Sequence, residues 1–219
     1  MNTKQKALRK MIGLFILFVL YTMSLKFIDV QKVGPQNAKV GWATINEYFL
    51  AKIGSNHLWC QVTEILGFFP LMIVGYFVVC GFWQLVLRKK ISLVDKEIVF
   101  LGFLYAGSAA AYVFFERVII NYRPILVNGQ LEPSYPSSHT FLAITVLLSA
   151  FYILYEQGKI KRIVSYLCLI GMIILVGGRA LSGVHWITDI FGGILLSILF
   201  VSIYLSTLEN SSDNNKKER

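Results

Sequence analysis

Charged side chains are scarce in this chain of 219 residues. Asp, Glu, Lys and Arg together make up 15% of it, whereas a soluble domain carries about a quarter. Hydrophobic residues make up 56%. This balance excludes a disordered chain, a coiled coil and a typical cytosolic enzyme, because so little polar surface could not keep a globule of this size in solution. The composition predicts one membrane-embedded domain.

Cysteine is rare as well, and its positions show no metal-ligand spacing. Cys60, Cys80 and Cys168 each lie in or beside an apolar run, where cysteine behaves as a small packing residue. The odd count does not indicate a disulfide framework. We therefore expect neither a disulfide-stabilised fold nor a metal site.

Acidic residues are outnumbered by basic ones, 12 to 21, which gives a formal net charge of +9. The basic residues form short clusters between apolar runs and do not line one face, so the charge does not indicate a nucleic-acid partner. The clusters are informative about orientation instead, because cytoplasmic loops of membrane proteins carry an excess of Lys and Arg.

Long apolar runs are abundant by contrast, and six of them come close to the roughly 20 residues that a spanning helix needs. They lie at about Met11–Ile28, Leu58–Val86, Val94–Phe115, Thr140–Tyr155, Ile163–Val176 and Ile190–Leu205. The last three are short, so we expect them to extend into their flanks or to lie in locally thin bilayer. The sequence predicts an all-α bundle of six transmembrane helices over residues 1–209, followed by a polar, frayed cytoplasmic tail at 210–219.

The basic residues predict the orientation of this bundle. Fourteen of the 21 lie at the N-terminus, in the connections after the second and fourth runs, and in the tail. The positive-inside tendency places these segments, and therefore both termini, in the cytoplasm. We expect a multi-pass protein of the cell membrane whose outer face receives three connections, at residues 29–57, 116–139 and 177–189.

The first outer connection contains an amphipathic stretch, Val40–Ile53. Its apolar residues recur at helical spacing, namely Trp42, Ile45, Phe49, Leu50 and Ile53. Such a helix could lie in the membrane interface or pack over the outer mouth of the bundle, and the pattern fits both equally well.

Polar residues are costly near a membrane, so their placement is informative. Three polar clusters lie on the outer connections: Tyr122–Pro124 after the third span, Tyr135–Thr140 before the fourth, and Gly178–Asp189 before the sixth. All three are expected to meet on the outer face of the bilayer, where a functional site would be built.

All three clusters contain groups that suit an anion. Ser137 or Ser138 can cap the fourth helix, whose N-terminal N–H groups and positive dipole end then form an anion site. Arg123 and Arg179 add planar guanidinium groups that match phosphate oxygens. The pattern indicates a phosphate-binding site.

The histidines supply groups that react. His185 and Asp189 lie four residues apart, so a helix would place the carboxylate beside one imidazole nitrogen and leave the other as a nucleophile or base. His139 is a second imidazole, able to protonate a leaving oxygen. Together with the anion site, these groups fit cleavage of a phosphate ester through a phosphohistidine.

The same residues resemble the motifs of a known family. Pro136-Ser137-Ser138-His139 and Arg179-x5-His185-x3-Asp189 closely resemble motifs two and three of the type 2 phosphatidic acid phosphatase (PAP2) superfamily, and Arg123-Pro124 resembles the end of its first motif. The resemblance covers about Glu116–Gly193, and the predicted six spans agree with the membrane branch of that family.

The resemblance implies a role for each matching residue. His185 would be the nucleophile, Asp189 its orienting partner and His139 the general acid toward the leaving group. Four groups would bind the phosphoryl oxygens: the side chains of Arg123, Arg179 and Ser137, and the backbone N–H of Ser138. The implied activity is a metal-independent, cofactor-free phosphatase on the outer face. Its substrate would be a lipid with a phosphomonoester or pyrophosphate headgroup, such as phosphatidate, phosphatidylglycerol phosphate or undecaprenyl pyrophosphate.

Three positions depart from the family pattern. Glu116 stands where the first motif has lysine, Ser138 replaces the usual glycine, and Gly178 stands where serine is frequent. Arg117 could replace the missing lysine, although one residue along a helix turns by about 100°. We expect instead that Glu116 pairs with Arg117, Arg123 or Arg179 and holds that arginine in place.

Other functional classes fit part of the pattern. A catalytically impaired family member would only bind phospholipid headgroups, and the presence of Glu116 in place of the lysine is the reason to consider this alternative. A lipid phosphotransferase would use the same site. A haem bundle held by His139 and His185 would need both imidazoles at matched depth inside apolar spans. Both histidines instead begin helices among arginines and serines, and a Soret band would distinguish this class.

Overall fold

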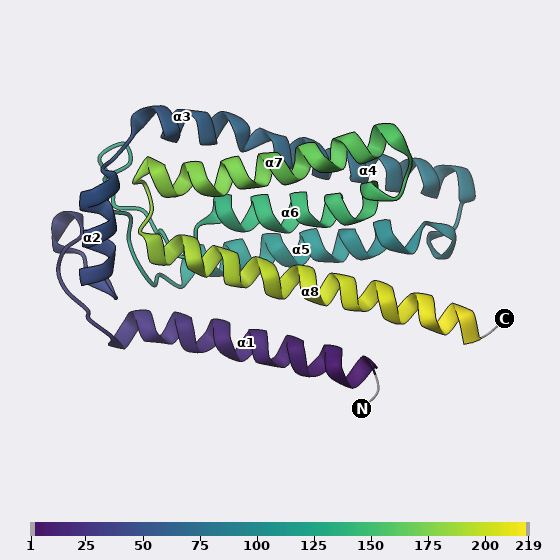
Figure 1. The fold of residues 1–219 in the computed structure, drawn as a ribbon, viewed down its shortest axis with the longest axis horizontal. Coiled ribbons are helices and arrows are strands. Elements are labelled where there is room, and N and C mark those ends of the chain that lie inside the picture. Colours follow the sequence, from purple (N-terminus) through teal and green to yellow (C-terminus); the bar gives the residue numbers. More distant parts are fainter. Residues whose placement is uncertain (1–2, 218–219) are drawn as a thin grey trace.

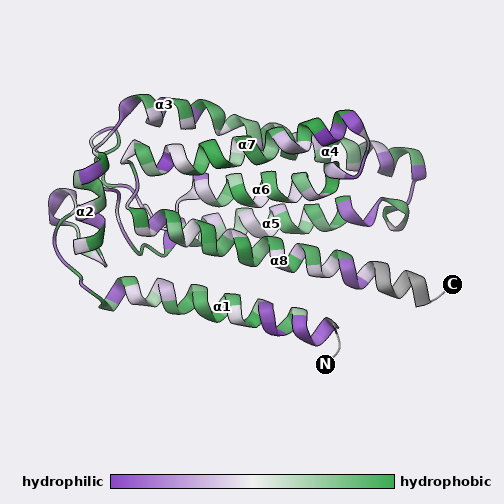
Figure 2. Ribbon diagram, in the orientation of Figure 1, coloured by the Kyte–Doolittle hydropathy of each residue, from purple (hydrophilic) through white to green (hydrophobic). Residues whose placement is uncertain are grey.

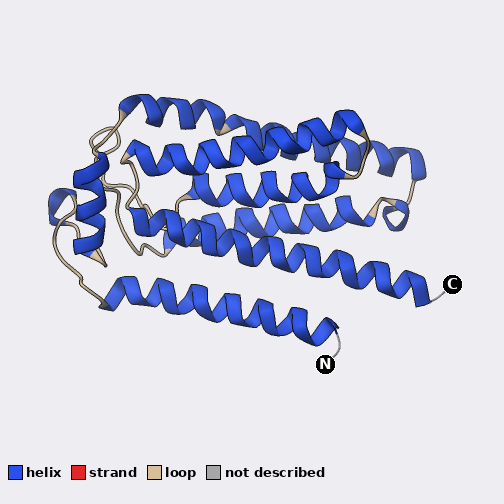
Figure 3. Ribbon diagram, viewed as in Figure 1, coloured by secondary structure: helices blue, strands red, loops and turns tan. Residues whose placement is uncertain are grey.

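The computed structural model describes residues 3–217, where the chain is helical except at its connections (Figure 3). Eight α-helices follow one another along the chain (Figure 1): α1 (Thr3–Phe27), α2 (Ala43–Ile53), α3 (His57–Leu66), α4 (Phe68–Arg88), α5 (Lys96–Arg117), α6 (Ser138–Tyr155), α7 (Lys159–Ser182) and α8 (Ile187–Lys217). Two short 3₁₀ turns, Pro35–Asn37 and Ile91–Leu93, lie in connections. Between residues 3 and 217 the structure contains isolated β-bridges but no strand.

The six predicted membrane spans are confirmed. Six helical segments are long and apolar enough to cross a membrane, and the second of them, His57–Arg88, consists of α3 and α4 together. The fifth and sixth extend into their flanks as expected, to Lys159–Ser182 and Ile187–Ser211. Figure 2 shows apolar residues along these helices and polar residues gathered at their ends and connections.

The segment expected to be a frayed tail is helical as far as the structure describes it. Helix α8 continues to Lys217, because no glycine or proline follows Gly193 to end it. Residues 218–219 of the tail lie outside the described residues. The boundary at residue 209 therefore has no counterpart in the secondary structure, and the extent of the membrane domain stays a prediction.

Helix α6 forms the centre of the bundle and is the shortest span. Of its 18 residues, 11 are buried, and it packs between α7, α8 and α4. Eighteen residues give a length of about 27 Å, slightly less than a hydrocarbon core of about 30 Å. Figure 1 shows that α6 begins further inside the bundle than the neighbouring end of α7 and start of α8. A small cavity lined by Arg123, Ser134, Ser138 and His185 lies at its N-terminus, and we call this place the recess.

The second span is interrupted at Gly67, between α3 and α4. Pro70 has no backbone N–H, so the carbonyl of Leu66 cannot receive its helical hydrogen bond, and a break close to this proline follows. A Cβ atom at Gly67 would lie 3.3 Å from Cδ2 of His139. The break therefore brings the α3–α4 junction close to the N-terminus of α6.

Helix α2 lies across the ends of the other helices, at the end of the bundle where α6 begins (Figure 1), within the predicted stretch Val40–Ile53. Its buried Asn46 donates a hydrogen bond to the carbonyl of Gly41 over 2.9 Å, and its Oδ1 lies 3.1 Å from the Thr188 hydroxyl. Thr188 is in the first turn of α8, so α2 is fixed to the bundle. Of the two arrangements that the sequence allowed, the structure has the helix packed over the mouth.

Residues 121–134, between α5 and α6, form a hairpin that we call the outer hairpin, after the side of the membrane predicted for it from the sequence. The N–H of Ser134 donates to the carbonyl of Asn121 over 2.9 Å, and that of Arg123 to Glu132 over 3.0 Å. Asn128 and Gly129 turn the chain at φ values of 50° and 76°, which an Asn-Gly pair adopts readily. This pairing fixes which side chains of the connection face the recess.

Candidate active site

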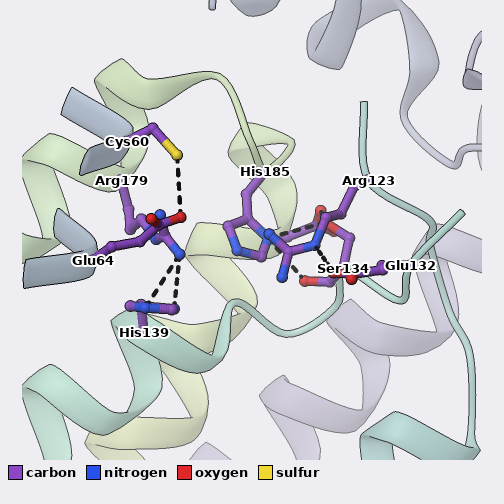
Figure 4. A network of polar contacts seen from close by, with 9 residues as sticks. Cys60, Glu64, Arg123, Glu132, Ser134, His139, Arg179 and His185 are labelled. Atoms are coloured by element: carbon purple, nitrogen blue, oxygen red, sulfur yellow. Dashed lines mark hydrogen bonds and ion pairs between the residues drawn. The ribbon is translucent and has the colours of Figure 1, made fainter. Parts of the chain in front are cut away.

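The three predicted polar clusters meet in the recess above α6 (Figure 4). The backbone N–H of Ser137 donates to the carbonyl of Asp189 over 3.0 Å, which joins the start of α6 to the first turn of α8. Nη2 of Arg179, near the end of α7, lies 2.9 Å from Nδ1 of His139. The outer hairpin adds Arg123 from the other side.

His185 lies in the short loop between α7 and α8, and only 4% of it is exposed. Its Nδ1 is 3.1 Å from the carbonyl oxygen of Ser134 and 3.0 Å from the hydroxyl of the same residue. Because a carbonyl oxygen only accepts, the ring proton belongs on Nδ1. Nε2 is buried and has no hydrogen-bond partner among the described residues. It therefore keeps a free lone pair.

The imidazole of His185 is also held neutral. Burial, followed by the nearby guanidinium groups of Arg123 and Arg179, keeps the pKa of His185 well below its usual value. Burial disfavours the charged ring, and the two cations repel it. A neutral ring at physiological pH is the form that a nucleophile needs.

Asp189 does not contact His185 in the way the spacing predicted. Helix α8 begins only at Ile187, so the four-residue separation does not fall on one helical face. The carboxylate is fully buried and accepts hydrogen bonds from Ser134 Oγ over 2.6 Å, Asn121 Nδ2 over 3.0 Å and the N–H of Trp186 over 3.2 Å. The direct pair expected from the sequence is replaced by an indirect connection through Ser134.

Both predicted arginines reach the recess. Arg179 is 2% exposed, and its Nη1 donates to Thr63 Oγ1 over 3.1 Å. Figure 4 shows the guanidinium of Arg123 lying beside the imidazole of His185, and both residues line one small cavity. Nε of Arg123 is 3.2 Å from a carboxylate oxygen of Glu132. Both cations are thus close enough to act on the charge of the His185 imidazole.

The N-terminus of α6 is open toward the same place. Ser137 occupies the cap position, but its side chain accepts no hydrogen bond from the helix backbone; its Oγ accepts one from Thr140 over 3.1 Å. The capping bond expected of Ser137 or Ser138 is therefore absent. The backbone N–H groups of Ser138, His139 and Thr140 have no acceptor within residues 3–217. Such free N–H groups at a helix start attract an anion.

A second, much larger cavity extends from His139 into the apolar part of the bundle. It has a volume of about 510 Å³. Its walls are mostly apolar and come from α4, α5 and α6, for example Leu71, Val74 and Leu142, while Glu64 lies on it from α3. Ser138 lines this cavity and the small one, so the two adjoin at the start of α6.

Glu116 does not hold an arginine as expected. Its side chain is exposed at the edge of the small cavity, and the ion pair of Arg123 is with Glu132. Arg117 is exposed and lines neither of the two cavities, so it does not stand in for the family lysine. The pairing could not be foreseen because it depends on the register of the outer hairpin, which puts the carbonyl of Glu132 opposite the N–H of Arg123.

Four further residues of the site were missed from the sequence: Asn121, Ser134, Glu132 and Thr63. The first three lie in the outer hairpin, where polar residues are common and no motif distinguishes them. Thr63 accounts for the glycine at position 178, because a Cβ atom at that position would lie 2.6 Å from Cγ2 of Thr63. Glycine lets α3 approach α7 closely enough for Thr63 to bind Arg179.

Comparison with known proteins identifies the family and a similar fold. The family model described as PAP2 superfamily matches residues 97–213. Among solved structures, the chain is similar to one described as the first transmembrane PAP2 type phosphatidylglycerolphosphate phosphatase from Bacillus subtilis. The two share 16% identity at a TM-score of 0.65, over 92% of this chain and 96% of that one. No curated protein matches. The family match includes most of the helices that carry the recess, and the chain belongs to the PAP2 superfamily of membrane phosphatases.

Proposed function

We propose that the protein hydrolyses the phosphomonoester or pyrophosphate headgroup of a membrane lipid through a phosphohistidine at His185. The observation that carries this proposal is the buried, unpartnered Nε2 of His185 beside Arg123. His185 lines a small cavity that adjoins an apolar cavity of about 510 Å³. A lipid phosphate could place its phosphate in the small cavity and its acyl or prenyl chains in the large one.

The reaction follows from the positions of the two imidazoles. Binding of the phosphate draws Nη2 of Arg179 away from Nδ1 of His139, which accepts a hydrogen bond from it in the structure, and His139 takes up a proton as imidazolium. Nε2 of His185 then attacks phosphorus, and the bond from phosphorus to the leaving oxygen breaks as the His139 imidazolium gives that oxygen a proton. His139 then takes a proton from water, whose oxygen attacks the phosphohistidine. Phosphate leaves, and both rings return to their starting states.

The cations and the start of α6 bind the charge that moves during these steps. Arg123 and Arg179 present guanidinium groups to the phosphoryl oxygens, which form strong charge-assisted hydrogen bonds with them. The free N–H groups of Ser138 and His139 complete the cradle. Ser137 acts through its backbone, whose N–H is bonded to Asp189, and its buried side chain supports the turn.

The lipid class is inferred from the large cavity. Its apolar walls are a poor site for a soluble phosphate and suit the chains of phosphatidate, phosphatidylglycerol phosphate or undecaprenyl pyrophosphate. The solved relative is described as a phosphatidylglycerolphosphate phosphatase, which makes that lipid one of the first to test. We further propose that the recess faces the outside of the cell and both termini face the cytoplasm.

Phosphate release by the purified protein in detergent tests the proposal. The three lipids and p-nitrophenyl phosphate should be compared with and without EDTA, and His185→Ala should be assayed beside the wild type. We expect a lipid to be preferred, turnover to persist in EDTA, and His185→Ala to be inactive. His139→Ala should lose about 10²–10⁴-fold in rate.

Several outcomes would contradict the proposal. Turnover that survives His185→Ala would remove the phosphohistidine, and cleavage of p-nitrophenyl phosphate alone would remove the lipid. Binding of the lipids without any release of phosphate would indicate the headgroup-binding alternative. Transfer of the phosphoryl group to an added alcohol in preference to water would indicate a phosphotransferase.

A further inference from the structure

We propose that Ser134 is the positioning residue that connects His185 to Asp189, so that the carboxylate acts on the imidazole through a serine hydroxyl. This inference rests on the proposed role of His185 as the nucleophile. Ser134 is not part of the sequence motifs. It is the last residue of the outer hairpin and directly precedes the polar cluster Tyr135–Thr140.

The contacts are short and shielded from water. Ser134 Oγ lies 2.6 Å from Oδ2 of Asp189 and 3.0 Å from Nδ1 of His185. The carbonyl oxygen of Ser134 lies 3.1 Å from the same Nδ1. All three residues are less than 5% exposed, so water does not compete for these bonds. Figure 4 marks the contacts between Ser134 and the ring of His185 with dashed lines.

The direction of each hydrogen bond can be assigned. A carboxylate only accepts, so the hydroxyl hydrogen of Ser134 points to Asp189, and the lone pairs of its oxygen remain for Nδ1–H. Both oxygens of Ser134 therefore accept from Nδ1, which fixes the tautomer with Nε2 free. When Nε2 bonds to phosphorus the ring becomes positive, and the polarised hydroxyl transmits the charge of Asp189 to it. Nδ1 keeps its proton throughout.

The outer hairpin holds this arrangement from outside the helices. The N–H of Ser134 is bonded to the carbonyl of Asn121 over 2.9 Å, and the side chain of Asn121 donates to the other oxygen of Asp189 over 3.0 Å. The remaining contact of the carboxylate is the N–H of Trp186. No bond joins Asp189 to His185 within the described residues, so the hydroxyl of Ser134 is their connection.

A double-mutant cycle tests the connection. Ser134→Ala and Asp189→Asn should each lower kcat for the preferred lipid, by about 10²-fold for Ser134→Ala, with KM changed by less than about threefold because both arginines stay. The double variant should be no slower than the slower single variant, since both changes break one path. Losses that multiply in the double variant would show that Ser134 and Asp189 act separately.

Two matched pairs control for folding. Ser165→Ala removes an equally buried hydroxyl that is bonded to Arg162 far from the recess, and it should leave kcat unchanged. Ser134→Thr and Ser134→Val add the same bulk and differ only in the hydroxyl. We expect Ser134→Thr to turn over at least tenfold faster than Ser134→Val, and equal rates would overturn the inference.

The two proposals fail differently. A wild-type protein that releases no phosphate from any lipid of the panel refutes the proposed function without reference to Ser134. An active wild type whose rate changes by less than about threefold in Ser134→Ala, while His185→Ala is inactive, keeps the proposed function and refutes the role of Ser134.

Discussion

At the scale of single residues, the hydroxyl of Thr63 deserves a direct test because it binds a buried guanidinium. Arg179 Nη1 donates to it over 3.1 Å, and Nε of the same arginine is already without a partner among the described residues. Thr63→Val keeps the shape and leaves Nη1 unsatisfied, which costs about 1–3 kcal/mol. We expect a higher KM for the lipid phosphate and a lower thermal midpoint, measured by lipid titration and unfolding in detergent.

Thr145 provides the control for this change. It is fully buried in α6, and its hydroxyl has no hydrogen-bond partner in the described structure. Thr145→Val should therefore be neutral or slightly stabilising and leave KM unchanged. A Thr63→Val variant that behaves like Thr145→Val would mean that Arg179 is held without Thr63.

At the scale of helices, the packing of α3 on α7 depends on one glycine. A Cβ atom at Gly178 would lie 2.6 Å from Cγ2 of Thr63 and 2.9 Å from the ring of Trp59. A Cβ atom at the neighbouring Gly177 would have none of the surveyed heavy atoms within 4 Å. Gly178→Ser, which restores the residue frequent in the family, should separate the helices and destabilise the protein by about 1–3 kcal/mol. Gly177→Ser should change the unfolding midpoint far less, and equal midpoints would contradict the packing described.

The helices also show what the sequence could and could not predict. The six spans could be predicted because each prediction sums the hydropathy of some 20 residues. A local feature such as the helix break at Gly67 does not change that sum, so it was not predicted and did not affect the prediction of the span. Motif residues His139, Arg179 and His185 were found because their chemistry and spacing are unusual near a membrane. Ser134 was missed because its role depends on hairpin register and on the start of α8, neither of which hydropathy or spacing determines.

At the scale of the whole molecule, the proposed orientation can be tested by labelling. Gln130, in the outer hairpin, and Gln157, between α6 and α7, are both exposed and lie at opposite ends of the bundle. We expect an impermeant maleimide to label Gln130→Cys in intact cells and Gln157→Cys only after lysis. The parent protein, with its three native cysteines, gives the background. The reverse pattern would place the recess in the cytoplasm and invert the assignment.

The large cavity has a consequence for how such a protein can diversify. The residues proposed to react lie in α6, in α7 and in the loop that follows, all within the family match at residues 97–213. One wall of the large cavity is instead formed by Phe68, Leu71 and Val74, which precede that region. Mutations in this wall would alter the fit of a lipid chain without touching a group that contacts phosphate. For a lipid phosphatase of the proposed kind, one part of the chain pocket can thus change independently of the reacting residues, while α5 and α6 form the rest of it. A variant that exchanges only Phe68, Leu71 and Val74 for the residues of a relative should shift toward the lipid preference of that relative.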